Sequence, residues 1–355
     1  MRLRLALPTL ALALATLASA AAAEVTPIPA DAQKPFKHEL SGISMPATAA
    51  AIPRTVVEEF DDKQLDVAAE YRTPDQKEIT TIYVFRQVTG DVPLWFDRIQ
   101  REIEARDMFM SPRIAIAPTA FTPPGQRNAS GLIAVYAPGG QTWKSTGAAL
   151  ASTGDWFVSV RASSQTLTPQ QLLVRIQETL ASIQWPRTQA AMPAAVPVSP
   201  CGRPLAAAAE DAKPINDDLA AILVEAAAGA ESKDRKSAAA DPSHWCRDPM
   251  SLPYAGVYRP DGAQDRYLIA FQDAGRGMWV GPNSMADLLA KSQGNDRTSY
   301  MVELIEIDRH VGLGSFATLP PVAQAVWLNE HGTPRFSTST WGKNRNINLN
   351  SDVVK

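Results

Sequence analysis

A proline-rich stretch over residues 185–204 constrains the fold of this chain more than any other feature of its sequence. Its apolar residues follow neither the strand period nor the helix period. Proline fixes one backbone angle, removes a hydrogen-bond donor and forces the preceding residue into extended geometry. Such a stretch is typical of a semi-rigid spacer. We therefore expect an α+β protein of two domains, each an antiparallel β-sheet packed with a few helices, joined by a Pro/Ala-rich linker at residues 187–200.

The amino terminus has the three parts of a secretory signal. Arg2 and Arg4 precede a run of leucine and alanine, and small residues follow as far as Ala23. This order is typical of a cleavable signal peptide. A membrane anchor is the alternative, but Pro8 interrupts the run, which is shorter than the roughly 20 strongly apolar residues that a span requires. We expect a signal peptide at residues 1–23, cleavage near Ala23, and a periplasmic or secreted protein with no transmembrane segment after cleavage.

Charge and length limit the classes of partner. The 355 residues include 34 Lys or Arg and 37 Asp or Glu, for a formal net charge of −3, and no basic block is present. This balance argues against nucleic acid and anionic membranes as partners. Another envelope protein or a small ligand is the expected partner. A chain of this length normally forms two domains.

The two cysteines, Cys201 and Cys246, are expected to form a disulfide. An even number of cysteines in an exported protein favours pairing. A metal pair would need further ligands, and only His244 lies nearby; a redox pair would usually have the C-x-x-C spacing. We therefore predict a disulfide and no metal site.

The first domain is expected at residues 37–186, after an extended leader without fixed structure at residues 24–36. Asp91 is placed to cap a helix over residues 91–106, and Thr168 with Gln171 fits a capping box that opens a second helix over residues 168–184. Runs of β-branched and aromatic residues predict strands at 54–60, 65–71, 79–86, 113–117, 131–137, 142–151 and 155–162. Residues 118–130 form a polar loop that could border a groove.

The second, smaller and disulfide-linked α+β domain is expected at residues 201–355. Asn216 is a suitable cap for a helix that ends near Gly229, and Ser284 is a suitable cap for a short helix to Lys291. His331 and Gly332 are expected to form a plain turn. Strands are predicted at 254–259, 266–273, 278–281, 299–308 and 336–341, separated by glycine-containing turns.

Common catalytic and cofactor motifs are absent from the sequence. The glycines around Arg276 lie between strands and do not form a dinucleotide fingerprint, so no cofactor is expected. The strongest acid–base candidates are Asp308 and His310, which alternate onto one side of a strand where the carboxylate could orient the imidazole, with Asp273 as a possible third member. The alternative is a solvated charge pair at a strand end.

Two clusters are candidates for ligand binding. His244, Trp245 and Arg247 surround Cys246 and would suit a binding surface, although packing of the disulfide on Trp245 also explains them. Arg276, in a turn close to Asp273, could hold an anion; a local salt bridge is the alternative.

These observations favour an exported, non-catalytic accessory or binding protein of the cell envelope. The alternative is a periplasmic hydrolase that uses an Asp308/His310 acid–base pair. A third possibility, docking on a larger envelope complex, predicts an exposed apolar patch.

Overall fold

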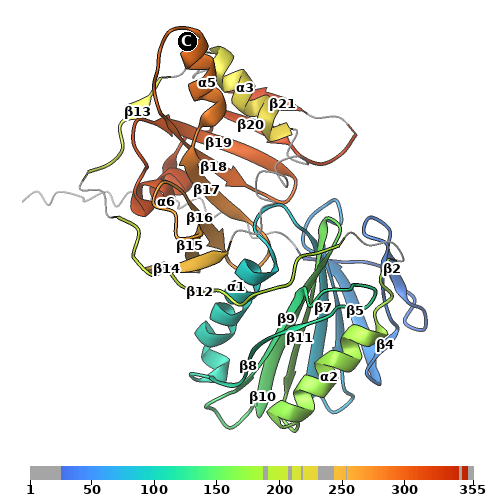
Figure 1. Cartoon of the computed structure of the whole chain (residues 1–355). Coiled ribbons are helices and arrows are strands. Elements are labelled where there is room, and N and C mark those ends of the chain that lie inside the picture. The colour runs from blue at the N-terminus through green and yellow to red at the C-terminus, as the bar shows by residue number, and fades with distance from the viewer. Residues whose placement is uncertain are drawn as a thin grey trace, which may run out of the picture.

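The computed structural model describes residues 25–186, 191–206, 210–216, 219–230, 244–252, 254–343 and 346–350. Two large sheets and five α-helices make up this part of the chain, and most strand pairs are antiparallel (Figure 1). The predicted α+β class is confirmed. The predicted signal peptide at residues 1–23 lies outside the described residues. No helix in the described ranges is long and apolar enough to cross a membrane.

The first sheet has the strand order β1-β5-β6-β7-β11-β10-β9-β8, with every pair antiparallel and β4 added beside β5. A separate hairpin joins β2 to β3. The strands are β1 (Thr26–Pro27), β2 (Phe36–His38), β3 (Ile43–Met45), β4 (Thr48–Ala49), β5 (Ile52–Glu59), β6 (Asp66–Arg72), β7 (Glu78–Arg86), β8 (Arg113–Phe121), β9 (Gly131–Ala137), β10 (Ser145–Thr153) and β11 (Trp156–Ser164).

Two amphipathic helices pack on this sheet, α1 (Val92–Ala105) and α2 (Pro169–Ser182). Side chains alternate between the faces of a strand, so Val158 on β11 packs with α2 while the neighbouring Phe157 packs with α1. The caps predicted for these two helices are confirmed. Asp91 accepts a hydrogen bond from the backbone N–H of Leu94, and Thr168 forms a complete capping box. A single turn of 3-10 helix, η1 (Asp107–Phe109), follows α1.

The second sheet has the order β12-β14-β15-β16-β17-β18-β19-β20-β21, with β13 added beside β19. Helix α6 packs into the main apolar cluster of this sheet, and α3 packs on Phe336 of β20. The elements are β12 (Ser199–Pro200), β13 (Pro214–Ile215), α3 (Leu219–Ala230), β14 (Trp245–Leu252), β15 (Ala255–Pro260), β16 (Tyr267–Phe271), β17 (Gly277–Pro282), α5 (Ser284–Ser292), β18 (Tyr300–Ile305), β19 (Arg309–Phe316), α6 (Val322–His331), β20 (Phe336–Ser339) and β21 (Ile347–Leu349).

Three local expectations are corrected. The leader was expected to lack structure, but Thr26 and Pro27 form β1 and pair with the edge of β5. The cap of α5 is Asn283, whose side chain accepts from the Ala286 N–H, and Ser284 is the first helical residue. His331 ends α6 and does not lie in a plain turn. Helix α6 has no clear apolar stripe because it buries mainly small residues, so its sequence gives little helical signal.

The described part of the predicted linker lies along the protein surface and contacts both sheets. We call residues 191–200 the strap; residues 187–190 lie outside the described part. The Ala195 N–H donates to the Ala129 carbonyl over 2.9 Å, and the Asn128 side chain donates to the Met192 carbonyl over 2.7 Å. At its end the strap forms β12, which pairs in parallel with β14. The strap therefore joins the two sheets closely and does not hold them apart.

Candidate binding site between the two sheets

Helix α1 lies between the two sheets (Figure 1). One of its side chains presents a buried carboxylate to the second sheet. Asp97 is 4% exposed. It accepts hydrogen bonds from Arg247 on β14 over 2.5 Å and from the Tyr258 hydroxyl on β15 over 2.7 Å. Beside it, Arg98 Nε donates to the Gln272 carbonyl over 2.8 Å. Burial and the neighbouring Asp97 raise the pKa of Tyr258 well above its ordinary value, so Tyr258 stays protonated and donates.

The contact around α1 is apolar as well as polar. One cluster of buried side chains contains Trp95 and Phe96 of α1 together with Tyr258, Leu268 and Ala270 of the second sheet. Apolar area removed from water stabilises such a contact by about 25 cal/mol per Å². The two sheets therefore share part of one core.

Three further ion pairs join the two sheets. Each contains a residue that the sequence indicated as a candidate for catalysis or binding. Asp273 pairs with Arg161 over 2.7 Å, and Arg276 lies 3.7 Å from the Asp66 carboxylate. Asp308 pairs with Lys63. The ion pair between Arg247 and Asp97, described above, also contains such a candidate. The structure thus places these candidates in the contact between the sheets, where each has a partner of opposite charge.

The most extensive single contact comes from Arg86 at the end of β7. Its guanidinium donates to the Ile307 carbonyl over 2.7 Å, to Thr340 Oγ1 over 2.9 Å and to the Thr340 carbonyl over 3.0 Å. It also lies over the Trp341 ring, 5.1 Å from the centroid. All of these partners belong to the second half of the chain.

The proposed acid–base pair is not assembled. His310 is 3% exposed, and its Nδ1 lies 3.0 Å from Oε1 of the buried Glu303 on the adjacent strand. Among the residues that the structure describes, no hydrogen bond or ion pair joins Asp308 to His310. The spacing in the sequence suggested that Asp308 would lie beside the imidazole. The carboxylate that lies there is Glu303 on the neighbouring strand, for which the sequence gave no signal.

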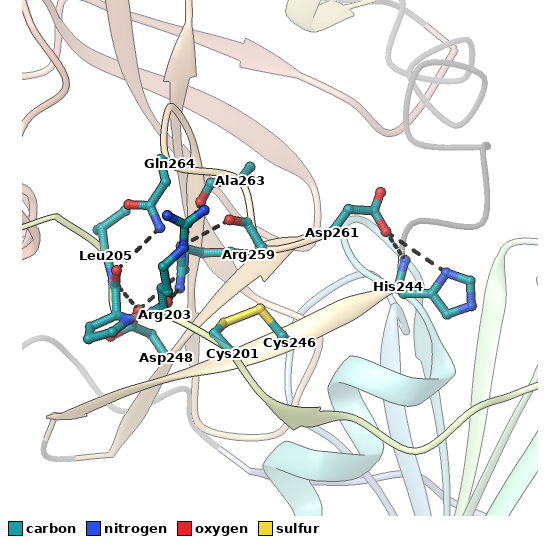
Figure 2. Close-up of a disulfide and its surroundings, with 12 residues drawn as sticks. Cys201, Arg203, Leu205, His244, Cys246, Asp248, Arg259, Asp261, Ala263 and Gln264 are labelled. Atoms are coloured by element: carbon teal, nitrogen blue, oxygen red, sulfur yellow. Dashed lines mark hydrogen bonds and ion pairs between the residues drawn. A yellow bond between two sulfur atoms is a disulfide. The ribbon is translucent and has the colours of Figure 1, made fainter.

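The disulfide is confirmed and fixes the strap to the second sheet. Figure 2 shows the bond between Cys201, which follows β12, and Cys246 on β14. Nearby, the fully buried guanidinium of Arg259 lies 3.2 Å from the Asp248 carboxylate and donates to the Arg203 carbonyl. Buried charges are tolerated when they are paired and hydrogen-bonded in this way.

His244 and Trp245 have different surroundings. The His244 side chain is 74% exposed, and its Nδ1 lies 3.9 Å from Asp261. Trp245 packs against the buried cluster around α1, and its side chain is hydrogen-bonded to the Asp91 carboxyl group. Trp245 therefore contacts the first sheet with its helices, which we call the first sheet unit, in addition to any packing on the disulfide.

A pocket of about 120 Å³ lies where the start of α1, the end of β10, the strap and the start of β14 meet. Both sheet units and the strap contribute to its wall. Its lining includes Asp91, Val92, Ser130, Ser152, Ala195 and Trp245. Ser130 closes the polar loop that was expected to border a groove, and His244 lines the exposed side.

Two polar groups in this pocket have unusual environments. Ser152 is 1% exposed, and its Oγ has no hydrogen-bond partner in the described structure. Burial raises the pKa of Asp91 to about 6, although hydrogen bonds from the Leu94 N–H and the Trp245 side chain oppose the shift. The sequence identified Asp91 only as a helix cap and gave no signal for Ser152, because the pocket forms from segments far apart in the chain.

Comparison of the sequence with known protein families and with curated proteins found no match. Within the described ranges, no three His, Cys, Asp or Glu side chains gather where they could share a metal ion. Exposed apolar side chains lie on the adjoining helices α3 and α5, namely Leu219, Leu223, Met285 and Leu288.

Proposed function

We propose that this chain is an exported, non-catalytic binding protein of the cell envelope that takes a small ligand in the pocket beside the strap. The observation that carries the proposal is the Ser152 hydroxyl, which is buried without a partner in the wall of that pocket. A buried polar group without a partner costs about 1–3 kcal/mol. A ligand that supplies the missing hydrogen bond would recover part of this cost.

The roles of the other candidate residues support a binding role. Asp273, Arg276, Arg247 and Asp308 each have a charged partner on the first sheet unit. Their charges stabilise the contact that forms the pocket. Export is supported by the sequence of residues 1–23, which has the order of a signal peptide.

Export is tested by cell fractionation with intact-mass measurement. The protein is expected in the periplasmic or secreted fraction as a chain that begins near Glu24. A full-length chain of 355 residues that stays in the cytoplasm would overturn this part of the proposal.

Binding is tested by NMR titration, with the indole N–H of Trp245 as the reporter, assigned through Trp245→Phe. Three probes of similar size and different charge are suitable: propylammonium, 1-propanol and propionate. Binding of any one of them, with a saturable shift of the Trp245 signal, supports the function. If none of the three shifts this signal, the pocket is not a small-ligand site.

A further inference from the structure

We propose that the pocket beside the strap selects a small organic ammonium ion, held by the carboxylate of Asp91 and the hydroxyl of Ser152. This inference rests on the proposed binding function and specifies its ligand class. It follows from the charge of the lining, the hydrogen-bonding capacity of its polar groups, and the size of the space.

The charge of the lining favours a cation. Asp91 and His244 are the titratable residues among those that line the pocket, and neither lysine nor arginine lines it within the described part of the chain. The Asp91 carboxyl accepts a hydrogen bond from the Leu94 N–H at the start of α1, and this bond favours its ionised form against the effect of burial. An anion would therefore meet a carboxylate with no lysine or arginine beside it, whereas an ammonium group gains a charge-assisted hydrogen bond.

The hydrogen-bonding groups match an ammonium head. A carboxylate has about four acceptor sites, and Asp91 has partners in the Leu94 N–H and the Trp245 side chain, which leaves capacity for a further donor. The Ser152 hydroxyl adds an acceptor that has no partner. On β10, Ser152 lies two residues after Leu150, on the strand face that packs toward α1, and it therefore points toward the pocket. A primary ammonium group offers three N–H donors.

The size and apolar lining favour a short alkyl group. An engineered cavity of about 150 Å³ binds benzene, so a pocket of about 120 Å³ suits a ligand of roughly four to six non-hydrogen atoms. Val92 and Ala195 supply apolar wall, and the face of an aromatic ring such as that of Trp245 attracts a cation. A short primary alkylammonium fits these limits.

The experiment compares propylammonium with 1-propanol and propionate at pH 7.5, using the Trp245 indole signal. Wild-type protein is expected to bind propylammonium most tightly. Asp91→Asn keeps the helix cap, since asparagine caps as well as aspartate, but removes the charge, and should weaken propylammonium binding at least about tenfold. Ser152→Ala should weaken it about threefold or more. Asp75→Asn, at an exposed turn, removes the same charge elsewhere and should leave the affinity unchanged.

The outcomes separate the two proposals. Preference for 1-propanol or propionate, or an equal propylammonium affinity in wild type and Asp91→Asn, would overturn the ammonium assignment while the binding function stands. Failure of all three probes would overturn both. Melting curves of Asp91→Asn and Ser152→Ala establish that each variant is folded, so a loss of affinity reports on the pocket.

Discussion

Asp66 is a carboxyl group buried where the two sheets meet, and burial raises its pKa to about 7 even though Arg276 on the second sheet opposes the shift. A carboxyl group with a raised pKa binds its proton more tightly in the folded state than in the unfolded state. Its contribution to stability is therefore fully present below about pH 4 and is lost as the pH rises through about 7. At higher pH the group no longer makes stability depend on pH.

We predict that Asp66→Asn removes this pH dependence. The free energy of unfolding of the wild type minus that of the variant should fall by up to about 4 kcal/mol between pH 4 and pH 7.5. Urea unfolding of both proteins at several pH values measures this difference. Asp75→Asn serves as a control in which the stability difference should change with pH in the opposite direction, because hydrogen bonds from Thr73 and Lys77 lower the pKa of Asp75. A difference in unfolding free energy between the wild type and Asp66→Asn that does not change with pH would contradict the prediction.

Ser152 allows a test in the unliganded protein. Its hydroxyl is buried without a partner, so Ser152→Ala removes a polar group that gains nothing from folding. The variant should be as stable as the wild type or more stable by about 1 kcal/mol, as measured by thermal unfolding. Ser145→Ala is the matched control: Ser145 Oγ donates to the Leu167 carbonyl over 2.8 Å, so this change should destabilise. A loss of stability in Ser152→Ala as large as in Ser145→Ala would show that its hydroxyl does have a partner.

At the scale of elements, the disulfide and the strap act together. The bond between Cys201 and Cys246 closes a segment with a sequence separation of 45 residues. On the chain-entropy account, such a closure stabilises the folded state by about 4 kcal/mol. The same bond holds β12 against β14, and with it the strap residues that line the pocket.

We predict that the double variant Cys201→Ser/Cys246→Ser loses about 2–4 kcal/mol of unfolding free energy and also weakens any binding at the pocket. Urea unfolding with and without reductant measures the first effect. Reductant should destabilise the wild type by the same amount and leave the variant unchanged. Thiol titration of denatured, unreduced wild type should find no free thiol; two thiols, or no effect of reductant, would contradict this account.

The sequence predicted those elements whose determinants are local. The caps at Asp91 and Thr168 and the strand expected at 155–162 depend on residues within a few positions of each other, and the structure has both caps and strand β11. Strand β1 and helix α6 were missed because one is too short for a pattern and the other lacks an apolar stripe.

The candidate site was predicted less well for a related reason. Asp97 and Arg247 are 150 residues apart, and nothing in local spacing tells which carboxylate an arginine will meet. The sequence singled out Arg247, Asp273 and Arg276 as polar residues with a role, but the contact between sheets that gives them that role forms only in the folded chain.

For the whole molecule, the central question is whether the two sheets unfold together. They share an apolar cluster around α1, and Asp97 and Arg86 each bind groups on the second half. Removing one partner of a buried pair is strongly destabilising, because the other charge is left without compensation. These contacts should couple the sheets into one cooperative unit despite the proline-rich linker between them.

We predict that hydrogen exchange of β11 in the first sheet and of β17 in the second reports the same opening free energy in the wild type. In the double variant Arg86→Ala/Asp97→Asn the total stability should fall by about 3–5 kcal/mol, and the two strands should exchange with different free energies, because two of the charged contacts between the sheets are lost. Hydrogen-exchange mass spectrometry resolves peptides from the two strands. Lys37→Ala removes an exposed ion pair with Glu39, and such pairs contribute about 0–1 kcal/mol, so the strands should stay coupled. Different opening free energies already in the wild type would show that the linker, and not the shared core, decides how the two sheets unfold.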